Sequence, residues 1–235
     1  MNALVWGVEW RLALADRRAL ALRVVLPLAL VLVVYTGGVP VGPGCAACVA
    51  LFMALAMLRT SLPLVQDERS GLAARVMRGG VSSSSYLLQR AATGAVLVLV
   101  SLLPSLAVIA LVEHASLVEI VVALLALGAT LWIASLLGVL LGAAARTVSE
   151  MLLVSAVLLV VLLHVSGVFH TPSADGLGAV IEGIAPFRVL HEAFLQMSSG
   201  ATVGGALAAA AWAVILPVVV GVLAPRVLGD VRAAG

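Results

Sequence analysis

Long runs of apolar residues, separated by short polar stretches, make up most of the 235-residue chain. A helix needs about 20 mostly apolar residues to cross a bilayer. Six runs reach or approach this length, and four of them contain a proline, which membrane helices tolerate better than soluble ones. The approximate bounds of the runs are 20–36, 44–65, 92–112, 118–144, 149–169 and 202–224. The pattern predicts an all-α membrane protein with six transmembrane helices in a single domain, 1–235.

Three segments outside these runs have patterns of their own. Residues 1–19 carry apolar side chains at roughly helical spacing, with Trp6 and Trp10 among them, which is typical of a helix lying along a membrane surface. Residues 66–91 form a charged loop, and residues 170–201 form a mixed segment that is too polar to span plainly.

Small residues recur every four positions in the fourth run, at Ala134, Gly138 and Gly142. Such a face lets two helices approach closely. It serves either packing inside the chain or a subunit interface.

The composition fits this picture, since 63% of the residues are hydrophobic and only 10% are charged, against about 25% charged in a soluble domain. All thirteen basic residues are arginines, and eleven fall on one side of the predicted spans. The positive-inside rule makes that side cytoplasmic, which predicts an inner-membrane protein with both termini in the cytoplasm. A net charge of +2, dispersed along the chain, does not indicate nucleic-acid binding.

Most catalytic chemistry is excluded by the residues that are missing. A P-loop requires a lysine, and the chain has none, so any ATP must be bound by a partner. The four histidines do not form H-E-x-x-H, and the pattern predicts no catalytic, cofactor or metal site. Cys45 and Cys48 form C-A-A-C without a second pair. They are interpreted as small residues of a membrane helix, with a disulfide at the outer rim as the alternative.

The loop reads QDERSGLAARVMRGGVSSSSYLLQR from Gln66 to Arg90. In a helix over 67–78, Leu72, Val76 and Met77 share one face. The pair Gly79-Gly80 can end this helix with left-handed backbone angles, and Ser82 to Ser85 can cap the next one. A short helix with one apolar face suits insertion into the groove of a partner protein.

This loop resembles the one that follows the second span in permeases of the type-2 ABC exporter family. The family pattern reads E-R-x-G, then a short amphipathic helix, P-V-S, and a run ending near Y-L-L-G-K. The matching residues are Glu68, Arg69, Gly71, Arg75, Val76, Met77, Val81, Ser82, Tyr86, Leu87 and Leu88, with Arg90 in place of the closing lysine. Gly80 replaces the proline, Ala73 a leucine and Gln89 a glycine.

The resemblance implies a transport subunit without its own ATPase site. Two such domains, identical or paralogous, would pair, and each would bind an ABC ATPase subunit that holds ATP and Mg²⁺. Residues 1–19 would be the elbow helix, the loop 66–91 would contain the coupling helix, and 170–201 would be an external re-entrant segment. The residues implied in contact with the ATPase are Glu68, Arg69, Gly71, Leu72, Arg75, Val76, Met77, Val81 and Ser82. Those implied at an external gate are Pro186, Phe187 and Arg188.

Several alternatives stay open at this point. Arg59, a charge within the second span, is either structural, extending toward the cytoplasmic headgroups, or part of a pathway or subunit contact. The apolar spans favour export of a hydrophobic or amphipathic drug, lipid or peptide, while a haem-delivery permease of cytochrome maturation shares the charged loop. A membrane scaffold or assembly factor is a third class. A polytopic membrane enzyme would have to use Glu113, His114, Glu119, His191 and Glu192.

Overall fold

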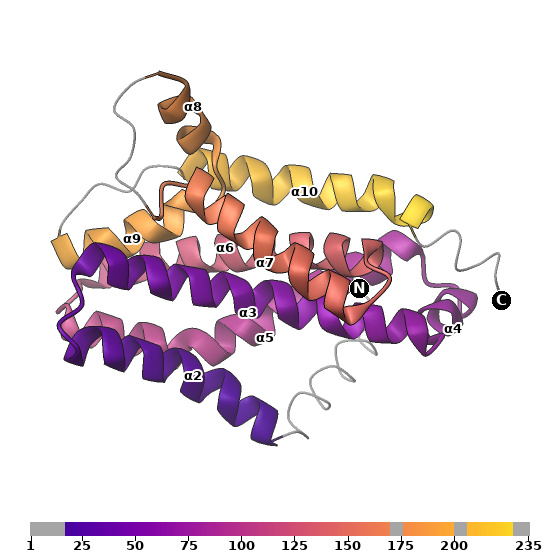
Figure 1. Cartoon of the computed structure of the whole chain (residues 1–235), viewed down its shortest axis with the longest axis horizontal. Helices are drawn as coiled ribbons and strands as arrows, with labels where there is room; N and C mark the ends of the chain where they lie inside the picture. Colours follow the sequence, from indigo (N-terminus) through magenta and orange to yellow (C-terminus); the bar gives the residue numbers. More distant parts are fainter. Residues whose placement is uncertain (1–16, 170–175, 200–205, 228–235) are drawn as a thin grey trace.

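The structure, a computed structural model, describes residues 17–169, 176–199 and 206–227, and within these ranges the regular structure is helical, with no strand. The helices are α2 (Arg17–Thr36), α3 (Val41–Arg69), α4 (Leu72–Arg78), α5 (Ser83–Val112), α6 (Leu117–Ala144), α7 (Val148–Val165), α8 (Gly176–Ile184), α9 (Arg188–Ser199) and α10 (Ala206–Val227). The long helices run alongside one another, with α4 at one end of the bundle and α8 and α9 at the other (Figure 1). These ends are called the α4 end and the α9 end below.

A helix occupies each of the six predicted spans. Five of them, α3, α5, α6, α7 and α10, are long and apolar enough to cross a membrane. The apolar part of α2, Ala21–Thr36, is shorter than this. The predicted elbow helix falls on residues 1–16, which lie outside the described residues, and the remaining positions 17–19 belong to α2.

Side-chain caps set the starts of three long helices. The Ser82 hydroxyl accepts a hydrogen bond from the Ser85 amide at 3.3 Å, which confirms the predicted cap of α5. Ser116 and Glu119 form a reciprocal capping box at the start of α6. Thr147 accepts from the Glu150 amide at 3.0 Å and begins α7. Because the cap at Ser82 precedes the apolar run by ten residues, α5 begins well before the predicted span at 92.

The small-residue face of α6 packs inside the chain, against α3. A Cβ atom built on Gly138 would lie 2.5 Å from the Met57 carbonyl oxygen, and one on Gly142 would lie 2.8 Å from that of Ser61. Such backbone contacts leave room for glycine alone at these two positions. Of the two roles predicted for this face, close packing within the chain is therefore the one observed.

The α9 end is closed by short helices. Phe194 of α9 meets Phe52 of α3 edge to face, with ring centroids 6.1 Å apart. The Trp212 indole of α10 donates to the Ile184 carbonyl at 2.8 Å and fastens the end of α8. A pair of short helices is what the resemblance implies for 170–201, but residues 170–175 and 200–205 lie outside the described ranges and re-entry into the membrane stays a prediction.

The spans α7 and α10 each leave a large apolar face uncovered. Leu153 and Val157 of α7 are 67% and 57% exposed, and Val218 of α10 is 62% exposed. Apolar faces of this extent are covered by lipid or by another subunit when the chain is in a membrane.

Candidate functional site

The charged loop is organised by Gly71. Its φ of 67° lies in the left-handed region that favours glycine. The Gly71 amide donates to the Glu68 carbonyl at 3.1 Å and closes α3, while the Gly71 carbonyl accepts from the Arg75 amide at 3.1 Å and begins α4. The single helix predicted over 67–78 is therefore wrong, because the chain turns sharply at Ser70 and Gly71.

An ion pair fastens the two long helices on either side of α4. The Tyr86 hydroxyl of α5 donates to Oδ2 of Asp67 at 2.7 Å, and the Arg90 guanidinium pairs with the same oxygen. The Arg90 side chain also lies over the Tyr86 ring, 5.8 Å from its centroid. Asp67 and Arg90 are 12% and 13% exposed, so the pair is largely shielded from water. It holds the last turn of α3 against the first two turns of α5.

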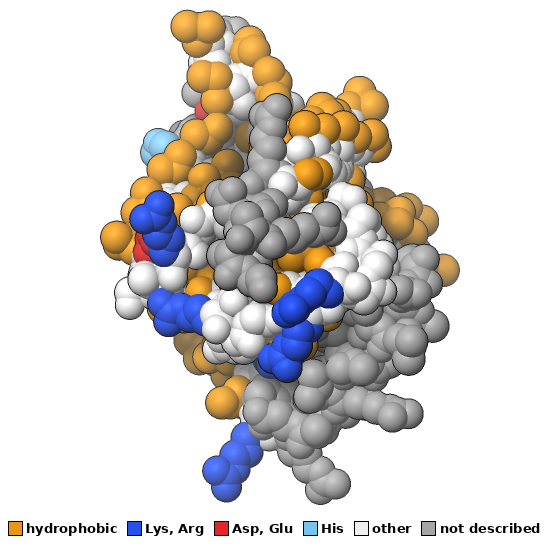
Figure 2. Space-filling view, turned by 90° about the vertical axis from the view of Figure 1, so that its right-hand side faces the viewer, with side chains coloured by type: hydrophobic (Ala, Val, Ile, Leu, Met, Phe, Trp, Pro, Cys, Tyr) orange, Lys and Arg blue, Asp and Glu red, His pale blue; other side chains and the backbone are white. Residues whose placement is uncertain are grey.

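Arginines make further backbone contacts at this end. A guanidinium nitrogen of Arg69 donates to the Arg146 carbonyl at 3.2 Å, linking α3 to the turn between α6 and α7. Arg75 donates to the Ser70 carbonyl at 3.0 Å and covers the end of α3. Figure 2 looks onto the α4 end, where arginine side chains gather. The exposed arginines of this end include Arg69 of α3, Arg75 and Arg78 of α4, and Arg146 in the turn between α6 and α7.

The residues predicted to contact a partner differ in how exposed they are in the structure. Met77 is only 4% exposed and Ala73 is fully buried, so the expected position of Met77 on an outward apolar face is wrong: that side of α4 packs on the chain itself. Val76 and Val81 are half-buried and also pack against the core. Leu72 is the large apolar side chain of α4 that stays exposed, at 41%.

The remaining predicted contact residues are placed around this exposed part of α4. Arg69, Arg75 and Ser82 are exposed, and Glu68 and Gly71 are half-buried. The surface that α4 offers is thus one apolar side chain, Leu72, among arginines.

Gly80 occupies the place where the resembled family has proline, and its backbone excludes that residue. Its φ is 90°, whereas proline fixes φ near −65°. We expect Gly80→Pro to destabilise the loop by about 3 kcal/mol and Gly80→Ala by about 1 kcal/mol, because both must leave the left-handed region. Thermal unfolding of the purified chain in detergent measures this. Equal stability of Gly80→Pro and the unmodified chain would contradict it.

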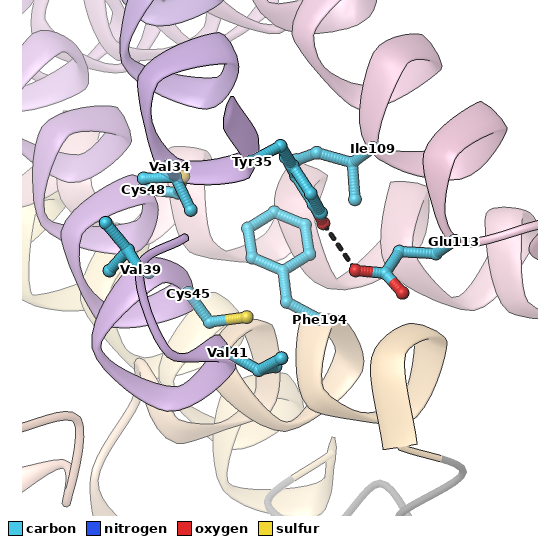
Figure 3. Close-up of a pocket in the computed structure, with 10 residues that line it drawn as sticks. Val34, Tyr35, Val39, Val41, Cys45, Cys48, Ile109, Glu113 and Phe194 are labelled. Atoms are coloured by element: carbon cyan, nitrogen blue, oxygen red, sulfur yellow. Dashed lines mark hydrogen bonds between the residues drawn. The ribbon is translucent and has the colours of Figure 1, made fainter. Parts of the chain in front are cut away.

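A small cavity lies at the opposite, α9 end (Figure 3). Its volume is about 90 Å³, which is room for a few water molecules rather than a drug-sized ligand. The Tyr35 hydroxyl of α2 donates to the Glu113 carboxylate at 2.8 Å beside it. Cys45 and Cys48 line the cavity, half-buried and buried, together with the Phe194 ring, and neither cysteine is part of a disulfide. The structure therefore agrees with the interpretation of Cys45 and Cys48 as residues of a membrane helix, and it does not contain the disulfide that was the alternative.

Arg59 faces a second cavity, of about 220 Å³, between α2, α3 and α5. Arg23 of α2 lines the same cavity, and both side chains are half-buried. The sequence did not bring these two residues together, since 36 positions separate them and they belong to different helices. Arg59 therefore lies against another helix of the chain and not on an outward face.

Of the predicted gate residues, Pro186 and Phe187 lie between α8 and α9, and Arg188 is the first residue of α9. Pro186 and Phe187 are buried, and Phe187 is fully enclosed in the core. Arg188 pairs with Glu192 one turn later on α9. A gating role for these residues stays a prediction.

The side chains that a membrane enzyme would have to use together make separate structural contacts. Glu119 belongs to the capping box of α6, Glu113 accepts a hydrogen bond from Tyr35, and Glu192 pairs with Arg188 on α9. Burial lowers the pKa of His191, which favours its neutral form. Among the described residues, no group of three His, Cys, Asp or Glu side chains could hold a metal ion.

Comparison with known families gives one assignment. The ABC-2 type transporter family matches residues 3–197, which include the charged loop and the first five of the six helices that correspond to predicted spans. Comparison with curated proteins and with solved structures gives no significant match. Together with five helices able to cross a membrane, the family match makes this chain a multi-pass membrane subunit of an ABC transporter. The chain belongs to the ABC-2 type transporter family.

Proposed function

We propose that this chain is the membrane permease of an ATP-driven exporter of hydrophobic or amphipathic molecules, and that α4 is the helix through which a separate ATPase acts on it. The observation that carries the proposal is the Asp67–Tyr86–Arg90 cluster. It ties the end of α3, which precedes α4, to the start of α5, which follows α4, so a force on α4 reaches both long helices.

The surface of α4 supports this role. Leu72 offers an apolar anchor, and the surrounding arginines Arg69, Arg75 and Arg78 give the rim a positive charge. A partner groove with an apolar floor and acidic rim would complement it. In this arrangement the α4 end is cytoplasmic, both termini lie on that side, and six helices including α2 cross the inner membrane.

In the proposed cycle, ATP and Mg²⁺ bind the partner ATPase, since the chain has no lysine for a P-loop. Two permease subunits, identical or paralogous, face each other, each with one ATPase. Closure of the ATPases on ATP moves the α4 helices, and the spans shift toward an outward-facing state. ATP drives this change because it binds one state more tightly than the other. The uncovered faces of α7 and α10 offer surface for the second subunit and for lipid.

The test is co-purification with the ATPase, sought first among the genes next to that of this chain. We expect Leu72→Glu combined with Arg75→Glu to weaken ATPase binding at least tenfold, since an apolar anchor and its charged rim are both reversed. Arg146→Glu, which changes another exposed arginine, on the turn between α6 and α7, is the matched control.

Two further measurements, of salt dependence and of ATP turnover, test the same contact. Binding to the unmodified chain should weaken as ionic strength rises, because the rim contacts are screened. ATP turnover of the complex should fall in the α4 variant and stay normal in the control. Equal ATPase binding by the α4 variant and the unmodified chain would refute the role of α4.

A further inference from the structure

A long apolar groove runs between α5 and α6, next to the turn that joins them. Its volume is about 700 Å³, which lies within the range of roughly 300–1,000 Å³ that is usual for ligand sites. Its walls are leucine, isoleucine and alanine side chains from the last turns of α5 and the first turns of α6, among them Leu111 and Leu124. The lining is apolar apart from one imidazole, that of His114.

The groove is open toward the side of the bundle. Ala107 and Ala110 of α5 line it, and their small side chains leave space between the two helices. Leu106 is only 4% exposed, so the packing of α5 on α6 closes the groove on its inner side. Leu103 and Leu111 are 43% and 74% exposed and stand at its edge. In a membrane, an opening of this kind faces the acyl chains around the protein.

The length of the groove matches most of one leaflet. Along α5 it runs from Leu103 to Leu111, which are eight residues or about 12 Å apart. Half of the hydrocarbon core of a bilayer is about 15 Å thick. The polar residues Glu113 and His114 follow directly, where α5 ends, so one end of the groove lies at headgroup level. Glu113 also borders the cavity at the α9 end, which places the groove in the leaflet of that end.

The cross-section of the groove suits hydrocarbon chains better than a helix of another subunit. Spread over about 12 Å, the volume corresponds to a mean cross-section of about 60 Å². A helix with its side chains is about 10 Å across and fills roughly 80 Å². Extended acyl chains are narrower than a helix and can follow the apolar walls along their whole length.

We propose that this groove binds one phospholipid from the leaflet at the α9 end, with its acyl chains along α5 and α6 and its headgroup beside His114. A chain in the groove contacts two helices at once, and the added contacts sum to a preference over lipid on a single helix face. The imidazole can donate a hydrogen bond to a phosphate or ester oxygen of the headgroup. The bound lipid should therefore stay in place while the lipids along α7 and α10 exchange. This inference depends neither on the coupling role of α4 nor on the exported molecule.

Photo-crosslinking of the full chain in phosphatidylcholine vesicles tests the site. The probe is a phosphatidylcholine that carries a diazirine in the middle of one acyl chain, and labelled peptides are counted by mass spectrometry. We expect at least fivefold more label per residue on 103–124 than on the exposed faces of α7 and α10, a ratio that corresponds to about 1 kcal/mol of preferential binding.

Variants with a bulky side chain in the groove test the position of the lipid. Ala107 is exposed, so Ala107→Phe can fill the groove without displacing a core side chain, and it should lower the label on 103–124 at least fivefold. Ala110→Phe, one turn further along α5, is a second filling variant. Ala210→Phe adds the same ring at an exposed position of α10 and should leave this label unchanged. Thermal unfolding shows which variants keep the fold.

Lipid retention in detergent separates binding of the chains from binding of the headgroup. Native mass spectrometry should find one dipalmitoyl phosphatidylcholine retained by the unmodified chain and lost from the filling variants. Dibutyroyl phosphatidylcholine has the same headgroup on short chains and should not be retained. Equal label on the groove and on the faces of α7 and α10 would mean exchanging lipid only and would overturn the proposal. Unchanged label in a folded filling variant, or equal retention of the two lipids, would overturn it as well.

Discussion

Replacing Gly138 with alanine is expected to destabilise the chain by about 2 kcal/mol or more, and replacing it with leucine should prevent folding. The added Cβ would lie 2.2 Å from the Thr60 hydroxyl and 2.5 Å from the Met57 carbonyl oxygen. The carbonyl belongs to the α3 backbone and cannot move aside without separating α3 from α6. Thermal unfolding of the purified chain in detergent measures the loss.

The same helix supplies the matched control. A Cβ on Gly128 would meet nothing within 4 Å, so Gly128→Ala changes only helix propensity. Alanine is favoured over glycine in a helix by about 1 kcal/mol, and the control should be neutral or slightly stabilised. Similar unfolding temperatures for Gly138→Ala and Gly128→Ala would show that α3 and α6 do not meet as closely as described.

Replacing Asp67 with alanine is expected to cost roughly 3 kcal/mol, because it removes the shared acceptor of Tyr86 and Arg90 from a largely buried site. The first turns of α5 would then lose their main tie to the end of α3. Denaturant unfolding in detergent reports the stability. Protease cleavage after the arginines of α4 should also be faster, since the loop opens locally.

A double-mutant cycle isolates the interaction. Asp67→Asn and Arg90→Gln should each destabilise the chain, while the double variant should lose clearly less than their sum. Arg90→Lys, which introduces the lysine of the resembled family pattern, should keep most of the stability. Strict additivity of the two single variants would mean that Asp67 and Arg90 are not coupled.

Hydropathy located the helices more reliably than their ends. The run 44–65 marks where α3 is apolar, yet the helix continues through Asp67 and Glu68 to Arg69. Charged residues mark where the apolar span ends, but they do not end the helix. The length of the apolar run therefore does not give the length of the helix. The start or end of a helix could be predicted where it depends on one residue type, as with the serine cap at Ser82 and the glycine turn at Gly80.

Contacts between distant helices could not be read from the sequence. Asp67 gains its role from residues 19 and 23 positions later, and nothing in its own neighbourhood signals that. Met77 fits an apolar outward face by helical spacing, but spacing does not say which face meets the bundle. Arg23 lies near Arg59 because of the way α2 packs against α3, and the side-chain pattern of either helix does not determine that packing.

Because α3 is one continuous helix from Val41 to Arg69, a movement of one of its ends can be detected at the other. A helix of 29 residues is about 44 Å long, so a tilt of about 10° around its middle moves each end by roughly 4 Å. Asp67 lies at one end of α3. The chain's only cysteines, Cys45 and Cys48, lie at the other end, beside Tyr35 and Glu113. The rate at which a maleimide reaches these thiols would therefore follow events at α4 from the far side of the membrane, with no introduced label.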